Sequence, residues 1–134
     1  MSLFNCACRR NCALWSVIGA LAVGVVTAFL QITGTITVAP VFSYIPLGIA
    51  VVYLAVAFIV ASADEGTVSC PCGCTALAAL LVGALGTIVS ALVILAFAFV
   101  ATSIIGAIVL GVELFFFALM LASTACLAKC KAGC

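Results

Sequence analysis

Long apolar segments, interrupted by short polar ones, dominate the chain. One runs from Ala13 to Leu30, a second from about Phe42 to Ala63, and a third without interruption from Ala76 to Leu121. A helix that crosses a bilayer needs about 20 apolar residues, so the first two segments supply one helix each. The third is too long for one crossing and suits two, at about 1.5 Å of rise per residue. The pattern predicts an all-α fold, a four-helix apolar bundle of transmembrane-like character.

Local signals indicate where these helices begin and end. The mixed, β-branched stretch from Gln31 to Thr37 marks the end of the first helix or a frayed extension of it. Pro40 suits the first turn of the second helix, because the missing N–H of proline is not needed there. The long third segment is expected to break near Val100 to Ser103, where Thr102 or Ser103 can cap a fourth helix.

Two tandem copies of one unit account for this order of segments. Cys6-Ala7-Cys8 matches Cys70-Pro71-Cys72, and Gly19-Ala20-Leu21 matches Gly83-Ala84-Leu85 at the same offset. We interpret the match as a duplication within a single domain, residues 1–134, in which each copy is an αα-hairpin that follows a cysteine cluster. Repeat 1 covers about 1–67 and repeat 2 about 68–134. Chance similarity between helices rich in Ala, Val and Leu is the alternative.

The composition determines what surrounds the bundle. Hydrophobic residues make up 69% of the chain and charged residues 5%, whereas soluble domains carry about 25% charge. A small soluble monomer has too much surface for its volume to hide so many apolar groups. The helices must therefore meet a lipid bilayer or neighbouring copies of the chain in a homo-oligomer. The net charge is only +1 and no large basic patch is present, so we expect no nucleic-acid partner.

An even number of crossings brings both termini and the central loop to one side. The nine cysteines then share that side, and we call it the cysteine face. They form three triplets: Cys6, Cys8 and Cys12; Cys70, Cys72 and Cys74; and Cys126, Cys130 and Cys134. Arg9, Arg10, Lys129 and Lys131 accompany them, which predicts a cytoplasmic cysteine face if the chain is inserted in a membrane. The first apolar run exceeds the core of a signal peptide, so we expect a retained helix.

The clustered thiols permit two kinds of chemistry. Four thiolates could hold a tetrahedral zinc ion or an iron–sulfur cluster, and soft thiolates also favour Cu(I). Cys-x-Cys suits a looped or extended chelate, but the usual Cys-x-x-Cys spacing is absent. Disulfides would have to join different triplets or different molecules, because pairs within a triplet have poor bridging geometry. Nine is odd, so at least one thiol stays free, binds metal or crosslinks a neighbour. We prefer disulfide crosslinks to metal and expect no cofactor.

A catalytic constellation is missing from the sequence. A cysteine nucleophile needs a base beside it. The chain has no histidine, and its acids are Asp64, Glu65 and Glu113. We therefore expect that the protein is not an enzyme.

Glu113 is the one ionisable residue deep within an apolar segment. Such a group in a membrane helix is by default a functional-site hypothesis, and it could bind cations or carry protons. The structural alternative is a protonated acid that is hydrogen-bonded to Thr87, Ser90 or a backbone carbonyl.

Stripes of small residues predict which helix faces meet, because small side chains let backbones approach closely in an apolar medium. The stripes are Ala20, Gly24 and Ala28 in the first helix, and Ala79, Gly83, Thr87 and Ala91 in the third. We expect these two helices to touch, in a bundle with pseudo-two-fold symmetry. Phe115-Phe116-Phe117 covers much of the circumference of the fourth helix, so we expect some of these rings to face lipid or a neighbouring subunit.

Several short motifs together resemble small cysteine-rich hydrophobic proteins of spore-forming Firmicutes. The motifs are Cys-Ala-Cys-Arg-Arg-Asn-Cys at 6–12, the Gly-Ala-Leu helix, and the central cysteine cluster followed by Leu-Leu-Val-Gly-Ala-Leu-Gly-Thr at 80–87. The resemblance implies no activity and only a setting, a spore, in which layered shells are crosslinked after reducing metabolism has ended. That setting would remove the main objection to disulfides on a cytoplasmic side.

These observations lead to two functional expectations. The first is a structural, self-assembling protein in a spore-associated layer, filament or tube, with a cysteine face crosslinked within and between subunits. The alternative is an integral membrane protein that binds or transports a metal or another cation through its clustered thiolates.

Overall fold

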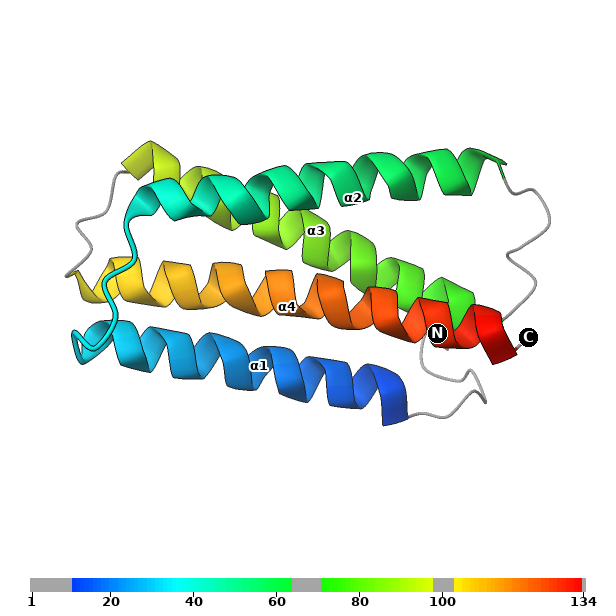
Figure 1. Cartoon of the computed structure of the whole chain (residues 1–134), viewed down its shortest axis with the longest axis horizontal. Helices are drawn as coiled ribbons and strands as arrows, with labels where there is room; N and C mark the ends of the chain where they lie inside the picture. The colour runs from blue at the N-terminus through cyan, green and yellow to red at the C-terminus, as the bar shows by residue number, and fades with distance from the viewer. Residues whose placement is uncertain (1–10, 64–70, 98–102, 134) are drawn as a thin grey trace.

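A computed structural model describes residues 11–63, 71–97 and 103–133. Its helices are α1 (Asn11–Ile32), η1 (Pro40–Ser43, a 3₁₀ turn), α2 (Tyr44–Ala63), α3 (Pro71–Phe97) and α4 (Ile104–Gly133). The described residues contain no strand, so the predicted all-α fold is confirmed. All four α-helices are long and apolar enough to cross a membrane. Successive α-helices run in opposite directions along the bundle (Figure 1).

Local hydrogen bonds fix the end of α1. Gly34 has a φ of +70°, which a residue without a Cβ adopts readily. The Gly34 N–H donates to the Gln31 carbonyl, and the Thr35 N–H donates to the Leu30 carbonyl. This pair of bonds is a Schellman motif, which satisfies carbonyls that the helix itself cannot. The first helix therefore ends at Ile32 rather than fraying into the polar stretch.

The predicted break in the long apolar segment is confirmed. α3 ends at Phe97 and α4 begins at Ile104. The Gly106 N–H donates to Ser103 Oγ at 3.0 Å, so Ser103 is the capping residue. Both helices extend further than the apolar pattern alone predicts: α3 already begins at Pro71, and α4 continues to Gly133.

Helix α4 is the central element of the bundle. It packs extensively against α1 and against α3, and α2 packs on α3 (Figure 1). The consecutive helices α1 and α2 share no comparable interface within the described residues. The expected packing of α1 against α3 is wrong, because both helices instead use α4 as their partner. The α3–α4 hairpin is thus closed, whereas the α1–α2 hairpin is open and the pseudo-two-fold arrangement is absent.

Both small-residue stripes are used, but each contacts α4. A Cβ on Gly24 of α1 would lie 2.8 Å from the Gly111 carbonyl oxygen, and a Cβ on Gly83 of α3 would lie 2.9 Å from the Met120 backbone nitrogen. Real Cβ atoms essentially never come that close to another heavy atom. Glycine at these two positions therefore allows the backbones of α1 and α3 to approach that of α4.

The three consecutive phenylalanines of α4 point toward different neighbours. Phe115 lies against Gly24 of α1, and the ring of Phe116 packs over Gly86 of α3. Phe117 packs on the buried cluster that α2, α3 and α4 form together. Each of the three residues is partly buried and partly exposed, so the expectation that some of these rings face lipid or a neighbouring subunit stays a prediction. A central helix has neighbours on several sides, and this explains why the three rings contact different helices.

The interior is small, and much apolar surface faces outward. The main cluster consists of Ala50 of α2, Leu80 and Ala84 of α3, and Met120 of α4. Large apolar side chains stay exposed on every helix, for example Trp15 (68% exposed), Phe58 (65%), Phe97 (69%) and Ile105 (62%). Contiguous apolar surface of this kind requires lipid or another protein surface to cover it.

We predict that Gly24→Ala loosens the contact between α1 and α4. The new methyl group would meet Gly111 and Phe115 at less than 3 Å, and such overpacking costs about 1–3 kcal/mol. Gly19→Ala is the matched control, because it lies in the same helix with nothing within 4 Å of its Cβ position. The measurement is the free energy of unfolding in detergent micelles, followed by circular dichroism. Equal effects of the two substitutions would contradict the described interface.

Candidate functional site

Glu113 is the buried carboxyl group of the bundle. Its side chain is 1% exposed. Carboxyl oxygen Oε2 accepts a hydrogen bond of 3.0 Å from Ser43 Oγ. The other oxygen, Oε1, is buried and has no hydrogen-bond partner among the described residues. The sequence prediction of an ionisable group inside the bundle is therefore confirmed, and its one described partner comes from η1.

The partners that we expected for Glu113 are engaged elsewhere. Thr87 Oγ1 donates to the Gly83 carbonyl at 2.7 Å, and Ser90 Oγ donates to the Gly86 carbonyl at 2.7 Å. Both bonds lie within α3, where a hydroxyl commonly bonds to the carbonyl four residues earlier. Sequence reasoning missed Ser43. The available signal was a small polar residue between Pro40 and the first turn of an apolar helix.

Ser43 is held inside the bundle by the segment that precedes α2. Pro40 lies in the first turn of η1, as the sequence predicts, and η1 packs against α3. The Ser43 side chain is 2% exposed, whereas the adjacent Phe42 and Tyr44 side chains are more than half exposed. The 3₁₀ turn therefore directs one hydroxyl inward and its larger neighbours outward.

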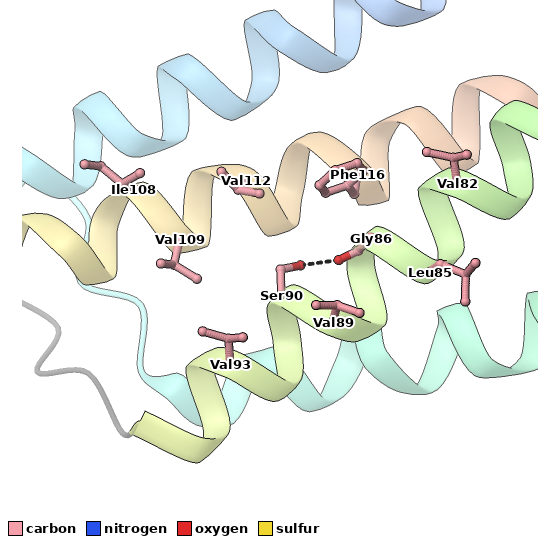
Figure 2. A pocket seen from close by; sticks show the side chains of 10 residues that line it. All are labelled: Val82, Leu85, Gly86, Val89, Ser90, Val93, Ile108, Val109, Val112 and Phe116. Carbon is pink, nitrogen blue, oxygen red and sulfur yellow. Dashed lines mark hydrogen bonds between the residues drawn. The ribbon is translucent and has the colours of Figure 1, made fainter.

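An apolar groove lies between α3 and α4. Its volume is about 590 Å³, and six of the ten residues that line it are Val or Ile (Figure 2). The one polar side chain in the lining is Ser90, whose hydroxyl is turned to the Gly86 carbonyl of its own helix. Phe116 lies against Gly86, between Val112 and Val82 along the groove (Figure 2). Glu113 does not line the groove, so carboxyl and groove are separate features.

Five of the nine cysteines fall within described helices. They lie at helix ends: Cys12 at the start of α1, Cys72 and Cys74 at the start of α3, and Cys126 and Cys130 near the end of α4. These ends lie at the same end of the bundle (Figure 1). Cys6, Cys8, Cys70 and Cys134 lie outside the described residues. The described part of the chain thus agrees with a shared cysteine face.

The helical backbone changes what the cysteine spacing means. Cys72 and Cys74 lie at the start of α3, in a helical backbone and not in the looped or extended backbone that suits a Cys-x-Cys chelate. Residues two apart in a helix do not share a face. Cys126 and Cys130 are four apart in α4 and do share one.

Cys126 has the one described cysteine side chain. It is 8% exposed and its sulfur takes part in a disulfide bond. The described side chains alone bring no three His, Cys, Asp or Glu residues together. A metal site made from the other cysteines therefore stays a prediction.

Comparisons with known proteins find no match for this chain among family models, curated proteins or solved structures. The features that point to a function are therefore those of the chain itself: the buried carboxyl, the cysteine face and the exposed apolar surface.

We predict that Ser43→Ala destabilises the bundle by about 1–3 kcal/mol, because it removes the described donor to a buried carboxyl. Ser123→Ala is the matched control. Ser123 is also buried, but its hydroxyl donates to the Leu119 carbonyl, which keeps its helical partner when the hydroxyl is lost. The free energies of unfolding of both variants in the same detergent provide the measurement. If Ser123→Ala lowered the free energy of unfolding as much as Ser43→Ala, the hydrogen bond from Ser43 to Glu113 would add no stability beyond that of another buried serine hydroxyl.

Proposed function

We propose that the chain is a structural protein that associates with copies of itself through its apolar faces. Disulfides on the cysteine face lock the assembly, both within and between subunits. The protein has no enzymatic activity, and the resemblance to proteins of spore-forming Firmicutes makes a spore-associated layer, filament or tube its setting. If the bundle is inserted in a membrane, its cysteine face lies on the cytoplasmic side.

The observation that carries this proposal is the distribution of apolar surface. Large apolar side chains project outward from all four helices, and the interior is made mostly of small residues. A single copy therefore buries little of its own apolar side-chain surface. Further apolar contacts, with other copies or with lipid, offer the largest remaining gain in free energy, at about 25 cal/mol per Å². The groove between α3 and α4 has apolar walls, so it does not suggest a charged soluble substrate.

The cysteines supply a second line of support. The helix ends that carry Cys12, Cys72 and Cys126 meet at one end of the bundle (Figure 1). Cys126 is already disulfide-bonded, which favours oxidation over metal binding for at least one thiol. Nine thiols cannot all pair within one chain, so an unpaired cysteine is available to join a neighbouring subunit.

We predict that the purified protein runs as a ladder of covalent multimers on a non-reducing denaturing gel and collapses to the monomer with a reductant. Alkylation before denaturation prevents exchange during the analysis. Mass spectrometry should find fewer than nine alkylated cysteines without reductant and nine with it. Nine reactive thiols in a non-reduced monomer would contradict the proposal.

Two further measurements on the same samples separate the competing functions. Cys126→Ser should expose one additional thiol to alkylation, because the former partner of Cys126 loses its bond. Elemental analysis tests for zinc, copper and iron. Stoichiometric metal that is released by alkylation would favour the alternative, an integral membrane protein that binds or transports metal through thiolates. Resistance of the multimers to detergent, after reduction, tests association through the apolar faces independently of the disulfides.

A further inference from the structure

The Glu113 carboxyl lies neither on the cysteine face nor on the outward apolar faces, so the proposed crosslinking and self-association do not use it. It lies inside the bundle, 1% exposed, with Ser43 as the described partner of one oxygen and no described partner for the other. A buried polar atom without a partner costs free energy. An apolar residue would pack here without that cost, so this carboxyl calls for an explanation.

The contacts between α3 and α4 show what lies opposite Glu113 on α3. Gly83 meets Met120, and three residues further along α3 Gly86 meets Phe116, as expected of antiparallel helices. One more turn in each helix brings Ser90 to the level of Glu113. Ser90 is buried, and it donates its hydroxyl hydrogen to carbonyls of its own helix. Its oxygen therefore remains an acceptor at this level.

The contacts of α2 place a second hydroxyl at the same level. Ser43 bonds to Glu113, and Ala50, seven residues later, shares a buried cluster with Met120, seven residues beyond Glu113. The two segments therefore keep the same register over two helical turns. Ser43 and Glu113 are hydrogen-bonded to each other across η1 and α4, and the helix register puts Ser90 of α3 at about the same height. We call this height, two turns from the apolar cluster, the polar level.

No counter-ion lies within the part of the chain that surrounds this level. The described residues of α1, η1, α2 and α3 include no Asp, Glu, Lys or Arg. The titratable groups that they contribute are Tyr44 and Tyr53, and the cysteines at the far end of the bundle. On α4 itself Lys129 is sixteen residues away from Glu113, or about 24 Å along the helix. A carboxylate at this position would be an unpaired buried charge, which is strongly disfavoured.

The carboxyl is closer to one end of the bundle than to the other. Glu113 is nine residues from the start of α4 at Ile104, about 14 Å, and fifteen residues from Ala128, about 22 Å. The nearer end is the one where η1 enters, opposite the cysteine face (Figure 1). Ser43, the hydrogen-bond partner of the carboxyl, belongs to η1 at this end, and residues 32–37, which precede η1 in the chain, are exposed.

We propose that Glu113 is a proton-binding site that exchanges with the solution at the η1 end of the bundle, with Ser43 as the positioning residue. The ligand is a single proton. When it binds, a neutral carboxylic acid forms that needs no counter-ion, and when it leaves, the negative charge stays on the carboxylate with the Ser43 hydroxyl as its donor. One carboxyl with one neutral hydroxyl as its described partner matches a proton better than a metal cation, since Ca²⁺ and Mg²⁺ take six or more oxygen ligands.

Reaction with dicyclohexylcarbodiimide tests this proposal on the full-length protein in detergent. The protonated carboxyl adds across a C=N bond of the reagent: a carboxyl oxygen bonds to carbon, and the proton moves to nitrogen. Mass spectrometry should locate the adduct at Glu113. Its rate should fall with rising pH, by about tenfold per pH unit once most copies are deprotonated. No adduct at Glu113 at any pH, in samples where Asp64 and Glu65 react, would overturn the proposal.

Variants and a salt comparison complete the test. Glu113→Gln should abolish the adduct while Asp64 and Glu65 still report active reagent. Infrared spectroscopy should show a protonated carboxyl band that is lost on raising the pH and absent in Glu113→Gln. Ser43→Ala should shift that band, because the hydrogen bond to the carboxyl is removed, whereas Ser123→Ala should leave it in place. A band that persists at every pH would mean a purely structural acid, and protection of Glu113 by Na⁺ at constant pH would assign the site to a metal cation instead.

Discussion

The close approach of α1 and α3 to α4 is the constraint on which the rest of the structure depends. In apolar surroundings helices gain little from the hydrophobic effect and associate through dense packing and polar contacts. Gly24 and Gly83 supply that density, because each allows a backbone to contact the backbone of α4. Because α4 has a helix on both sides, its consecutive phenylalanines contact different neighbouring helices. The position of α2 follows, since α2 packs on α3, its Ala50 shares a buried cluster with Met120 of α4, and the preceding η1 is bonded to α4 through Ser43.

The two halves of the chain contribute unequally to the buried interior of the bundle. The α3–α4 hairpin is closed and supplies most of the buried residues, whereas α1 and α2 flank it without packing on each other to a similar extent. Ala50 and Glu113 occupy corresponding positions in the two proposed repeats. Ala50 lies in the apolar cluster, and Glu113 lies in the polar level two turns away.

The two chemically active features lie toward opposite ends of one apolar body. The five cysteines within described helices lie toward one end of the bundle, and the carboxyl lies nearer the other end, where η1 turns into α2 (Figure 1). An apolar interior of about 22 Å along α4 separates Glu113 from Ala128. The proposed crosslinking on the cysteine face and the proposed proton binding at Glu113 therefore do not depend on each other. A covalently fixed assembly could hold many such carboxyls at one level, each surrounded by the same packed helices.

The sequence by itself determined the elements and their chemistry. Apolar segments of sufficient length predict four helices, and Pro40 and Ser103 mark two of their starts, because these signals depend on backbone chemistry within a few residues. The chain order also brings the cysteines to one end, and the apolar context identifies Glu113 as unusual. Only the tertiary structure decided which helices touch, because a stripe of small residues permits close packing without naming a partner. It also selected Ser43 as the donor to Glu113. That choice depends on the register of η1 against α4, which residues 70 positions apart in the chain do not encode locally.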